Sequence, residues 1–565
     1  MLKNKPRTMA GSPICSIISK HHVAPRQSRL LALAAALLVL LIGCSDRGKE
    51  QAGVVGTVRG FLGGAVADEP RAALVARDIL SAGGSAADAA VALYFTLGAT
   101  LPSTASLGGG GVCLVYDVKL NRTEMLDFAS RTPAGGGPIA LPTGPRGMFL
   151  LHSRHGKLRW EQLVGNAEAV ARFGRPVSRA LAADLLAAQA ILQRDPELRR
   201  TFLKSDGTTY REGEILVQHD LSTLLSAIRA RGSGELYNGP VAQRFVESAI
   251  AQGAAITIED MRAAVVAWRP AVAVRHDDIA LLVTSPPAVG GLVEGQIWGA
   301  AAPRWRRASP EERPHLLAQA GLRAWLDRSR WLAPDLTTAV SPPELVNDRH
   351  LATLMASYRA DQRTPPPRVR SEPMPDDAAA SGFVTADRDG NAVACTVSSY
   401  GLFGAGRMAA GTGVVLARAP DGVAAGPQWL GPVIGTTTSD RRLTLRSDAT
   451  GRQQVLFAAA ASGGAPAASA LAGVALRTLI ERRTLEEAMD ARRLHFEGAP
   501  ADTVFVEEGV QPRLPGLSER GYQVVPVPVI GRVNAFWCPD GLTDEPARCE
   551  FRPDRRGFGL AAGGS

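Results

Sequence analysis

The feature that most constrains the fold is a change of pattern at a proline-rich stretch, residues 363–380 ("RTPPPRVRSEPMPDDAAA"). Before it, apolar residues recur mainly at the spacing of helices, as in residues 70–101 and 159–264. After it, short apolar runs separated by turn residues predict strands. Helical material followed by strand-rich material is typical of an α+β protein built from packed layers. We expect the stretch itself to be exposed and irregular.

The length and charge of the chain narrow the class of protein. Its 565 residues suit one large domain or two ordinary ones, and 45% apolar with 21% charged residues is a globular composition. The formal net charge of +9 arises mainly in residues 1–43, which contain basic residues and no Asp or Glu. The remainder is nearly neutral, which argues against a nucleic-acid-binding protein. The chain contains no recognisable metal-ligand motif, so we expect no metal and no other cofactor.

The N-terminal segment has the order of a bacterial lipoprotein signal: a basic front, thirteen apolar residues (30–42), then Gly43 and Cys44. Thirteen residues suit the core of a signal peptide, whereas a bilayer span takes about 20. The sequence "LIGCS" resembles a lipobox, which implies cleavage before Cys44 and lipidation of its sulfur. We therefore expect residues 1–43 to be a signal peptide, residues 44–60 a tether, and the protein to be periplasmic and lipid-anchored. An uncleaved anchor is the alternative.

Four cysteines remain once the leader and the lipobox are set aside. Cys113 and Cys395 each lie in an apolar, strand-like run, and we expect both to be buried, unreactive thiols. Cys538 and Cys549 bracket a turn-rich loop. In an oxidising compartment these last two are candidates for a disulfide.

An ordered set of segments resembles the γ-glutamyltransferase family of N-terminal-nucleophile hydrolases. The set consists of "GAVADEPRAALVARDILSAGGSAADAAVA", "GGGGVCLVYD", "GELYNGPVA", "TSPPAVGG", "HLLAQAGLRAWLDRSR", "DRDGNAVACT" and "ASGGAP". Each match is weak alone, but their order holds along almost the whole chain after residue 60. The resemblance implies a four-layer αββα sandwich over residues 61–565, formed by one chain that usually cuts itself in two.

The nucleophile position of this family departs from its pattern here. An N-terminal nucleophile, Thr in the family, is activated by its own α-amine once the chain is cut before it. Alignment back from "DRDG" places Ala380 at that position and Ser381 next to it. A one-residue slip turns a side chain to the opposite face of a strand, so Ser381 can serve only if the strand start shifts. We expect cleavage before Ser381, which becomes the nucleophile and separates a large-subunit-like part (61–380) from a small-subunit-like part (381–565).

Other expected site residues follow from the same resemblance. Gly463 and Gly464 match the glycine pair whose backbone N–H groups stabilise the oxyanion, with an ordinary tight turn as the alternative. Ala129 replaces the arginine that holds the substrate carboxylate, and Arg131 lies two residues later on the same face of an extended segment. The remaining expected substrate-binding residues are Ser398, Tyr400, Asp421, Gln428 and Trp429.

Two functional hypotheses follow. In the first, the protein is an amidohydrolase or acyltransferase that acts on γ-glutamyl or related amide-linked peptides through Ser381. In the second, almost equally supported, it is a catalytically inactive relative that binds a periplasmic peptide or partner. The altered substrate positions argue against glutathione as the natural substrate. A small peptide or amide, and the membrane through lipidated Cys44, are the expected partners.

Overall fold

The computed structural model describes residues 61–365, 379–421, 426–438, 452–498, 503–509, 514, 516–544 and 546–563. The predicted signal peptide, Cys44, the tether and most of the proline-rich stretch therefore lie outside the described residues. Gly60–Ser565 form one compact unit. Within the described ranges, no helix has both the length and the apolar character needed to cross a bilayer.

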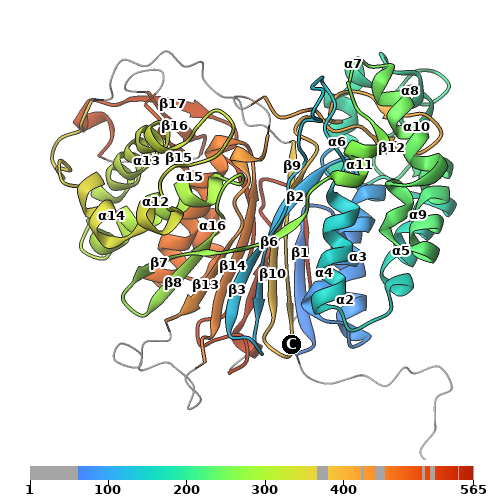
Figure 1. Ribbon diagram of the computed structural model, residues 1–565. Helices are drawn as coiled ribbons and strands as arrows, with labels where there is room; N and C mark the ends of the chain where they lie inside the picture. Colours follow the sequence, from blue (N-terminus) through green and yellow to red (C-terminus); the bar gives the residue numbers. More distant parts are fainter. Residues whose placement is uncertain are drawn as a thin grey trace, which may run out of the picture. The chain divides into compact units, whose positions relative to one another are not determined.

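Two antiparallel sheets form the centre of this unit (Figure 1). The seven-stranded sheet has the order β20 (Leu560–Gly563), β1 (Gly63–Ala67), β9 (Ala380–Asp387), β10 (Ala392–Ser398), β2 (Gly110–Asp117), β3 (Arg122–Phe128) and β6 (Ala267–Pro270). The six-stranded sheet has the order β19 (Glu550–Arg552), β18 (Arg532–Trp537), β14 (Val455–Ser462), β13 (Val433–Thr437), β8 (Ile279–Val283) and β7 (Val272–His276).

Helices cover the outer face of each sheet. The helices beside the seven-stranded sheet are α2 (Pro70–Ser81), α3 (Ala86–Thr100), α4 (Gly144–His155), α5 (Trp160–Phe173), α6 (Arg179–Ala187), α7 (Gln189–Leu192), α8 (Pro196–Phe202), α9 (His219–Arg231), α10 (Gly239–Ile250) and α11 (Ile258–Ala263). Those beside the six-stranded sheet are α12 (Gly290–Trp305), α13 (Glu312–Trp331), α14 (Asp348–Leu354), α15 (Ala465–Ala475) and α16 (Leu485–Asp490).

Short strands complete the secondary structure between these elements. They are β4 (Arg175–Pro176), β5 (Ile215–Leu216), β11 (Met408–Ala409), β12 (Val414–Val415), β15 (Leu494–His495), β16 (Thr503–Glu507) and β17 (Gln523–Val527). The strand-rich composition predicted for the chain beyond residue 380 is therefore present.

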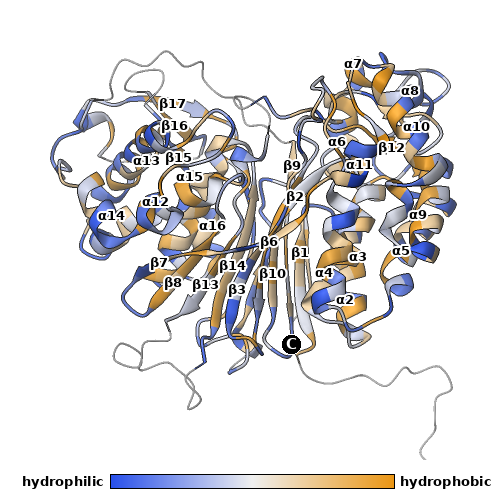
Figure 2. Ribbon diagram, viewed as in Figure 1, coloured by the Kyte–Doolittle hydropathy of each residue, from blue (hydrophilic) through white to orange (hydrophobic). Residues whose placement is uncertain are grey.

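Three apolar cores hold the layers together. One lies between the seven-stranded sheet and its helices, one between the six-stranded sheet and its helices, and the third between the two sheets. The strands accordingly carry much of the hydrophobic colour in Figure 2. Because burial of apolar area is the main favourable term in folding, this arrangement accounts for the four layers. The predicted αββα sandwich is confirmed.

The two helices predicted over residues 70–101 are α2 and α3. Gly83, with a φ of 89°, ends the first, as the glycine pair in the sequence indicated. The second begins at a capping box in which Ser85 and Asp88 each bond the other's backbone N–H. These local signals place α3 against β9, the strand on which the expected nucleophile lies.

Two disulfides are present among the described cysteines. The predicted Cys538–Cys549 bond is confirmed. The prediction of free thiols at Cys113 and Cys395 is wrong, because these residues form a disulfide between β2 and β10. Each apolar run does form a strand, but their antiparallel pairing sets the two cysteines directly opposite each other, with Cα atoms 4.1 Å apart. Spacing in the sequence carries no information about that register.

Candidate active site

The two faces of β9 decide which side chains can meet. Ala380 lines a small cavity, and Gly382, next on the same face, packs against Ala460 of β14. Ser381 and Phe383 occupy the other face, where the Phe383 ring belongs to the core under the helices. Alternation along the strand thus points residue 380 toward the space between the sheets and residue 381 toward the helices.

The glycine pair lies where the family resemblance placed it. Gly463 and Gly464 follow β14, line the same cavity as Ala380, and lead into α15. Their φ angles of 121° and 64° lie in the region that favours glycine, so this turn requires both residues. The structure therefore brings the expected oxyanion donors to position 380.

The cavity between Ala380 and the glycine pair is nearly filled. Its volume is about 20 Å³, room for roughly one water molecule. The side chains of Tyr400 and Trp429 line it. Thr396 also lines it, and its buried Oγ1 has no hydrogen-bond partner among the described residues. A buried hydroxyl without a partner is costly, so Thr396 favours a polar occupant at this place.

Ser381 is held away from this cavity by its own hydrogen bonds. The side chain is completely buried, and its Oγ donates to Asp68 Oδ2 over 3.0 Å. The same carboxylate oxygen accepts the Gly382 N–H, and Asn534 Nδ2 donates to the other oxygen over 2.7 Å. Burial raises the pKa of Asp68 above its ordinary value, although these hydrogen bonds oppose the rise.

The prediction that Ser381 faces Gly463 and Gly464 is therefore corrected. The strand does not shift at its start: β9 begins at Ala380, in register with Ser398 of β10. With that register fixed, the period of two along a strand sends the Ser381 hydroxyl to the helix side. Its partner there is Asp68, which sequence reasoning did not single out.

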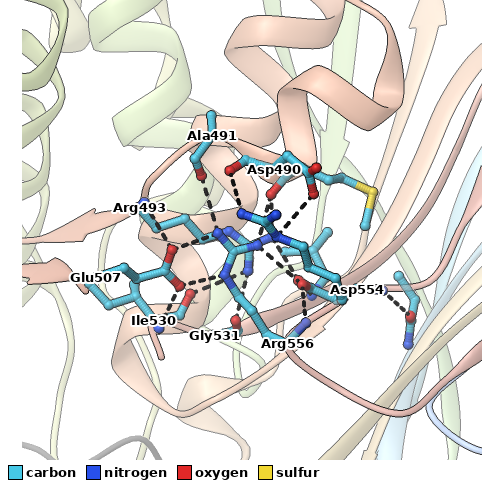
Figure 3. Close-up of polar contacts among 12 residues, drawn as sticks. Asp490, Ala491, Arg493, Glu507, Ile530, Gly531, Asp554 and Arg556 are labelled. Atoms are coloured by element: carbon cyan, nitrogen blue, oxygen red, sulfur yellow. Dashed lines mark hydrogen bonds and ion pairs between the residues drawn. The ribbon is translucent and has the colours of Figure 1, made fainter. Parts of the chain in front are cut away.

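Asn534 is positioned in turn by a buried ion-pair cluster near the C-terminus (Figure 3). Asn534 Oδ1 accepts the Asp554 N–H over 3.3 Å, and Asp554 pairs with Arg493 over 2.7 Å. Arg556 bonds both Asp554 and Glu507. Burial raises the pKa of Asp554, but the two guanidinium groups outweigh it and hold that pKa below its ordinary value. Asp554 thus stays ionised and holds the strand that carries Asn534.

A second carboxylate lies close to Asp68. Asp184 on α6 accepts a hydrogen bond of 2.6 Å from the Ser103 hydroxyl. Burial, with a smaller contribution from the charge of Asp68, raises the pKa of Asp184 to about 6. The helix side of β9 is therefore a polar cluster of two carboxylates and two hydroxyls.

Ser398 and Tyr400 both line the cavity, but their polar atoms are engaged. Ser398 Oγ donates to the Ala379 carbonyl over 2.7 Å and accepts the Tyr400 N–H over 2.8 Å. The Tyr400 hydroxyl donates to the Ser130 carbonyl over 3.3 Å, and burial raises its pKa well above the ordinary value. Tyr400 therefore acts here as a neutral wall of the cavity.

Arg131 and Asp421 do not reach the cavity. Arg131 pairs with Asp127 over 2.8 Å and donates to the Val265 carbonyl over 2.9 Å, so it does not replace the arginine missing at position 129. Asp421 is exposed and pairs with Arg418 over 2.7 Å. In both cases the arginine pairs with a carboxylate only three or four residues away along the chain. Such a pair forms with little loss of conformational freedom in the chain between the two residues.

Gln428 and Trp429 differ in their placement. Gln428 is fully buried and does not line the cavity, whereas Trp429 does. The Trp429 ring packs beside Trp325 and under the guanidinium of Arg328, whose central carbon lies 5.0 Å from the ring centroid. Cation–π contact of this kind holds the indole in place over the cavity.

Four polar residues at the site were not predicted from the sequence: Asp68, Asn534, Asp184 and Thr396. Asp68 and Asn534 are 466 positions apart, and no local pattern joins them. Thr396 lies on β10 beside Gly382, within the quoted segment "DRDGNAVACT", and alternation from Ser398 could have placed it on the cavity face. Within the described ranges, no three His, Cys, Asp or Glu side chains are close enough together to hold a metal ion.

Comparisons with known proteins agree with this architecture. A family model described as gamma-glutamyltranspeptidase matches residues 72–554. The glutathione hydrolase proenzyme of Pseudomonas aeruginosa is 28% identical over 79% of this chain and 85% of its own length. That of Escherichia coli is 25% identical over 86% and 90%. The crystal structure of cephalosporin acylase from Bacillus halodurans superposes with a TM-score of 0.73 at 19% identity, over 91% of this chain and 98% of that one, which shows a shared fold.

Proposed function

The chain belongs to the gamma-glutamyltranspeptidase family, and from this premise we propose that it binds an amide-linked, peptide-like ligand beside Gly463 and Gly464 without cleaving it through position 380. The relatives named glutathione hydrolase support this class of ligand. One observation carries the proposal: Ala380 occupies the place opposite the glycine pair, and the neighbouring hydroxyl, Ser381, is buried on the other face of β9.

The chemistry of the family explains why this observation matters. An N-terminal nucleophile attacks the substrate carbonyl while backbone donors receive the developing negative charge. A methyl group at position 380 has no electron pair to offer and cannot cut the chain before itself. The site keeps the backbone N–H groups of the glycine pair, the unpartnered Thr396 hydroxyl and two aromatic side chains that line the cavity. Together these groups can hold an amide. Since the cavity is nearly filled, a ligand must displace the Trp429 ring.

A variant that gains self-cleavage when a nucleophile is placed at position 380 would test the location of this position. We expect the wild-type protein to give one intact band on a reducing denaturing gel and no hydrolysis of a γ-glutamyl anilide. Reduction is necessary, because the Cys113–Cys395 disulfide would keep two pieces together. Ala380→Thr should begin to cut before residue 380, whereas Ala379→Thr, the same change one position earlier, should stay intact. A wild-type piece that starts at Ser381 would refute the proposal.

Ligand binding is the second test. Glutathione and γ-glutamyl dipeptides should raise the Tm of the wild-type protein as their concentration rises, because a ligand that binds only the folded state stabilises it. Thr396→Val removes the unpartnered hydroxyl at constant shape and should weaken the effect. Equal shifts in the wild-type protein and the variant would place the ligand elsewhere.

A second candidate function is hydrolysis through Ser381, and the Ser381–Asp68 hydrogen bond favours it. A hydroxyl next to a carboxylate with a raised pKa is a nucleophile beside a base. In this mechanism the Ser381 Oγ attacks the Ala380 carbonyl carbon and its proton passes to Asp68. The peptide bond between the two residues then breaks as Asp68 returns that proton to the nitrogen, which leaves Ala380 and Ser381 joined by an ester. Water hydrolyses the ester, giving the Ala380 carboxylate and a Ser381 with a free hydroxyl and a free amine. Ser381→Ala would abolish any such cleavage, and Ser381→Thr would preserve it.

We also propose that the protein is exported to the periplasm and anchored through a lipid on Cys44. The signal-like leader and the two disulfides support this location, because disulfides persist in oxidising compartments. Labelling of cells with a radioactive fatty acid should mark the wild-type protein and not Cys44→Ser. Label in both proteins would refute the anchor at this residue.

A further inference from the structure

A separate cavity lies among the helices on the outer side of the seven-stranded sheet. Its volume is about 250 Å³, and it opens between α2, the end of α3 and the short strands β4 and β5. The polar residues at its wall include Glu69, Arg71, Arg175 and Gln218. Ala380, Gly463 and Gly464 line a different cavity, so this one is distinct from the site described above.

Arg71 is the feature of this cavity that requires an explanation. It is half-buried, and among the described residues its side chain makes no hydrogen bond; its Nε is fully enclosed without an acceptor. Glu69 attracts this guanidinium electrostatically, but the Glu69 side chain accepts its hydrogen bonds from the backbone N–H groups of Arg71 and Ala72 and from the Thr100 hydroxyl. A desolvated guanidinium that lacks an acceptor is costly to the fold.

Two other arginines near Arg71 differ in whether their side chains are paired. Arg77, on the same helix and six residues later, is exposed and bonds Asp78 over 2.7 Å. Arg175, at the cavity wall, is exposed, and its side chain has no hydrogen bond or ion pair among the described residues. The cavity therefore has two unpaired guanidinium groups against one carboxylate that is already engaged, which leaves an excess of positive charge.

Apart from Thr100 and Ser178, the remaining wall is apolar. Val170, Val177, Leu181 and Leu216 line the cavity, and all four are at least 95% buried. A ligand with a single carboxylate suits the planar fork of Arg71, and a short hydrocarbon chain suits these side chains. A dianion such as inorganic phosphate suits it less, because Glu69 lies beside Arg71. At about 30 Å³ per water-sized group, 250 Å³ accommodates about eight non-hydrogen atoms.

We propose that this cavity binds a small monocarboxylate with a short apolar chain, held by Arg71 with Arg175 beside it. The site is independent of the function proposed for the cavity at Ala380. The two sites are linked along the chain, however. Glu69 directly follows Asp68, whose carboxylate accepts hydrogen bonds from the Ser381 hydroxyl and the Gly382 N–H. A ligand bound beside Arg71 can therefore influence the start of β9.

Calorimetric titration of the full-length protein with hexanoate, which has eight non-hydrogen atoms, tests the proposal. Hexanoate should bind at one site, whereas 1-hexanol, which lacks the charge, and chloride at equal ionic strength should bind at least 10-fold more weakly. Arg71→Gln should weaken hexanoate binding by about 10- to 100-fold, because it removes a charged hydrogen-bonding partner. Arg77→Gln, the matched control on the same helix, should leave it unchanged.

Arg175→Gln keeps the test decisive if Arg71→Gln does not fold. This exposed residue can be changed with little effect on the core, and its loss should weaken hexanoate binding by about 3- to 10-fold. Phosphate should bind more weakly than hexanoate to the wild-type protein. Absence of hexanoate binding in the wild-type protein, equal binding after Arg71→Gln in a folded variant, or tighter binding of phosphate would each overturn the proposal.

Discussion

Removal of the Cys113–Cys395 disulfide should destabilise the protein more than removal of the Cys538–Cys549 disulfide. The first joins residues 282 positions apart and the second residues 11 apart. By the loop-entropy relation, the longer loop restricts the unfolded chain by about 5–6 kcal/mol and the shorter by about 3 kcal/mol. With an unfolding entropy of about 2.1 cal/mol/K per residue over about 500 residues, the corresponding falls in Tm are about 5 °C and about 3 °C.

Differential scanning calorimetry of two double variants measures this difference. Cys113→Ala with Cys395→Ala removes the long-range bond, and Cys538→Ala with Cys549→Ala is the matched control. Alanine suits the buried pair, because it places no unpaired hydroxyl in the core under the helices. The reasoning is refuted if the control variant loses as much or more, or if Cys113 and Cys395 take up an alkylating label in unfolded, non-reduced protein.

Three further predictions concern the groups around the site. Asp554→Asn should cost about 3–5 kcal/mol in urea unfolding, because it leaves the buried Arg493 without its counter-ion; a loss below about 1 kcal/mol would contradict this. Asp184→Asn should stabilise the protein by up to about 3 kcal/mol above pH 7. The raised pKa of Asp184 means that the folded wild-type protein loses stability as the pH rises from 3.8 to about 6, and asparagine does not titrate. The gain should vanish near pH 3, and a gain independent of pH would exclude titration as its cause. Trp429→Ala should open the cavity and increase the Tm shift produced by glutathione, and a smaller shift would show that the indole contributes to binding instead.

The layered fold could be predicted from the sequence because its signals are local. The spacing of apolar residues in α2 and α3, the glycines between them and the alternation in β9 and β10 each depend on neighbouring residues. The glycine pair at 463 and 464 was placed by the family resemblance of the segment "ASGGAP", since the two glycines alone indicate only a tight turn. These elements then pack in four layers, because each sheet has one apolar face to bury under helices and another to bury against the other sheet.

The roles of individual site residues were harder to predict, because they depend on partners far away in the chain. Ser381 points to the helix side because the register of β9 with β10 is fixed over the whole strand, and Asp68 then captures its hydroxyl. Arg131 does not lie at the expected substrate position, because it pairs with Asp127, four residues earlier. Neither choice is visible in a motif, since both are settled by competition among hydrogen-bonding partners in the folded chain.

By itself, the sequence determined the helical and strand-rich parts of the chain and the alanine at position 380, because helix and strand periods and residue identity are properties of short segments. Only the tertiary structure decided which face of β9 meets the glycine pair, that Cys113 bonds Cys395, and that Arg71 is left without an acceptor. Each of these depends on strand register or on contacts between segments hundreds of residues apart, and the free energy of such contacts exists only once the layers have packed.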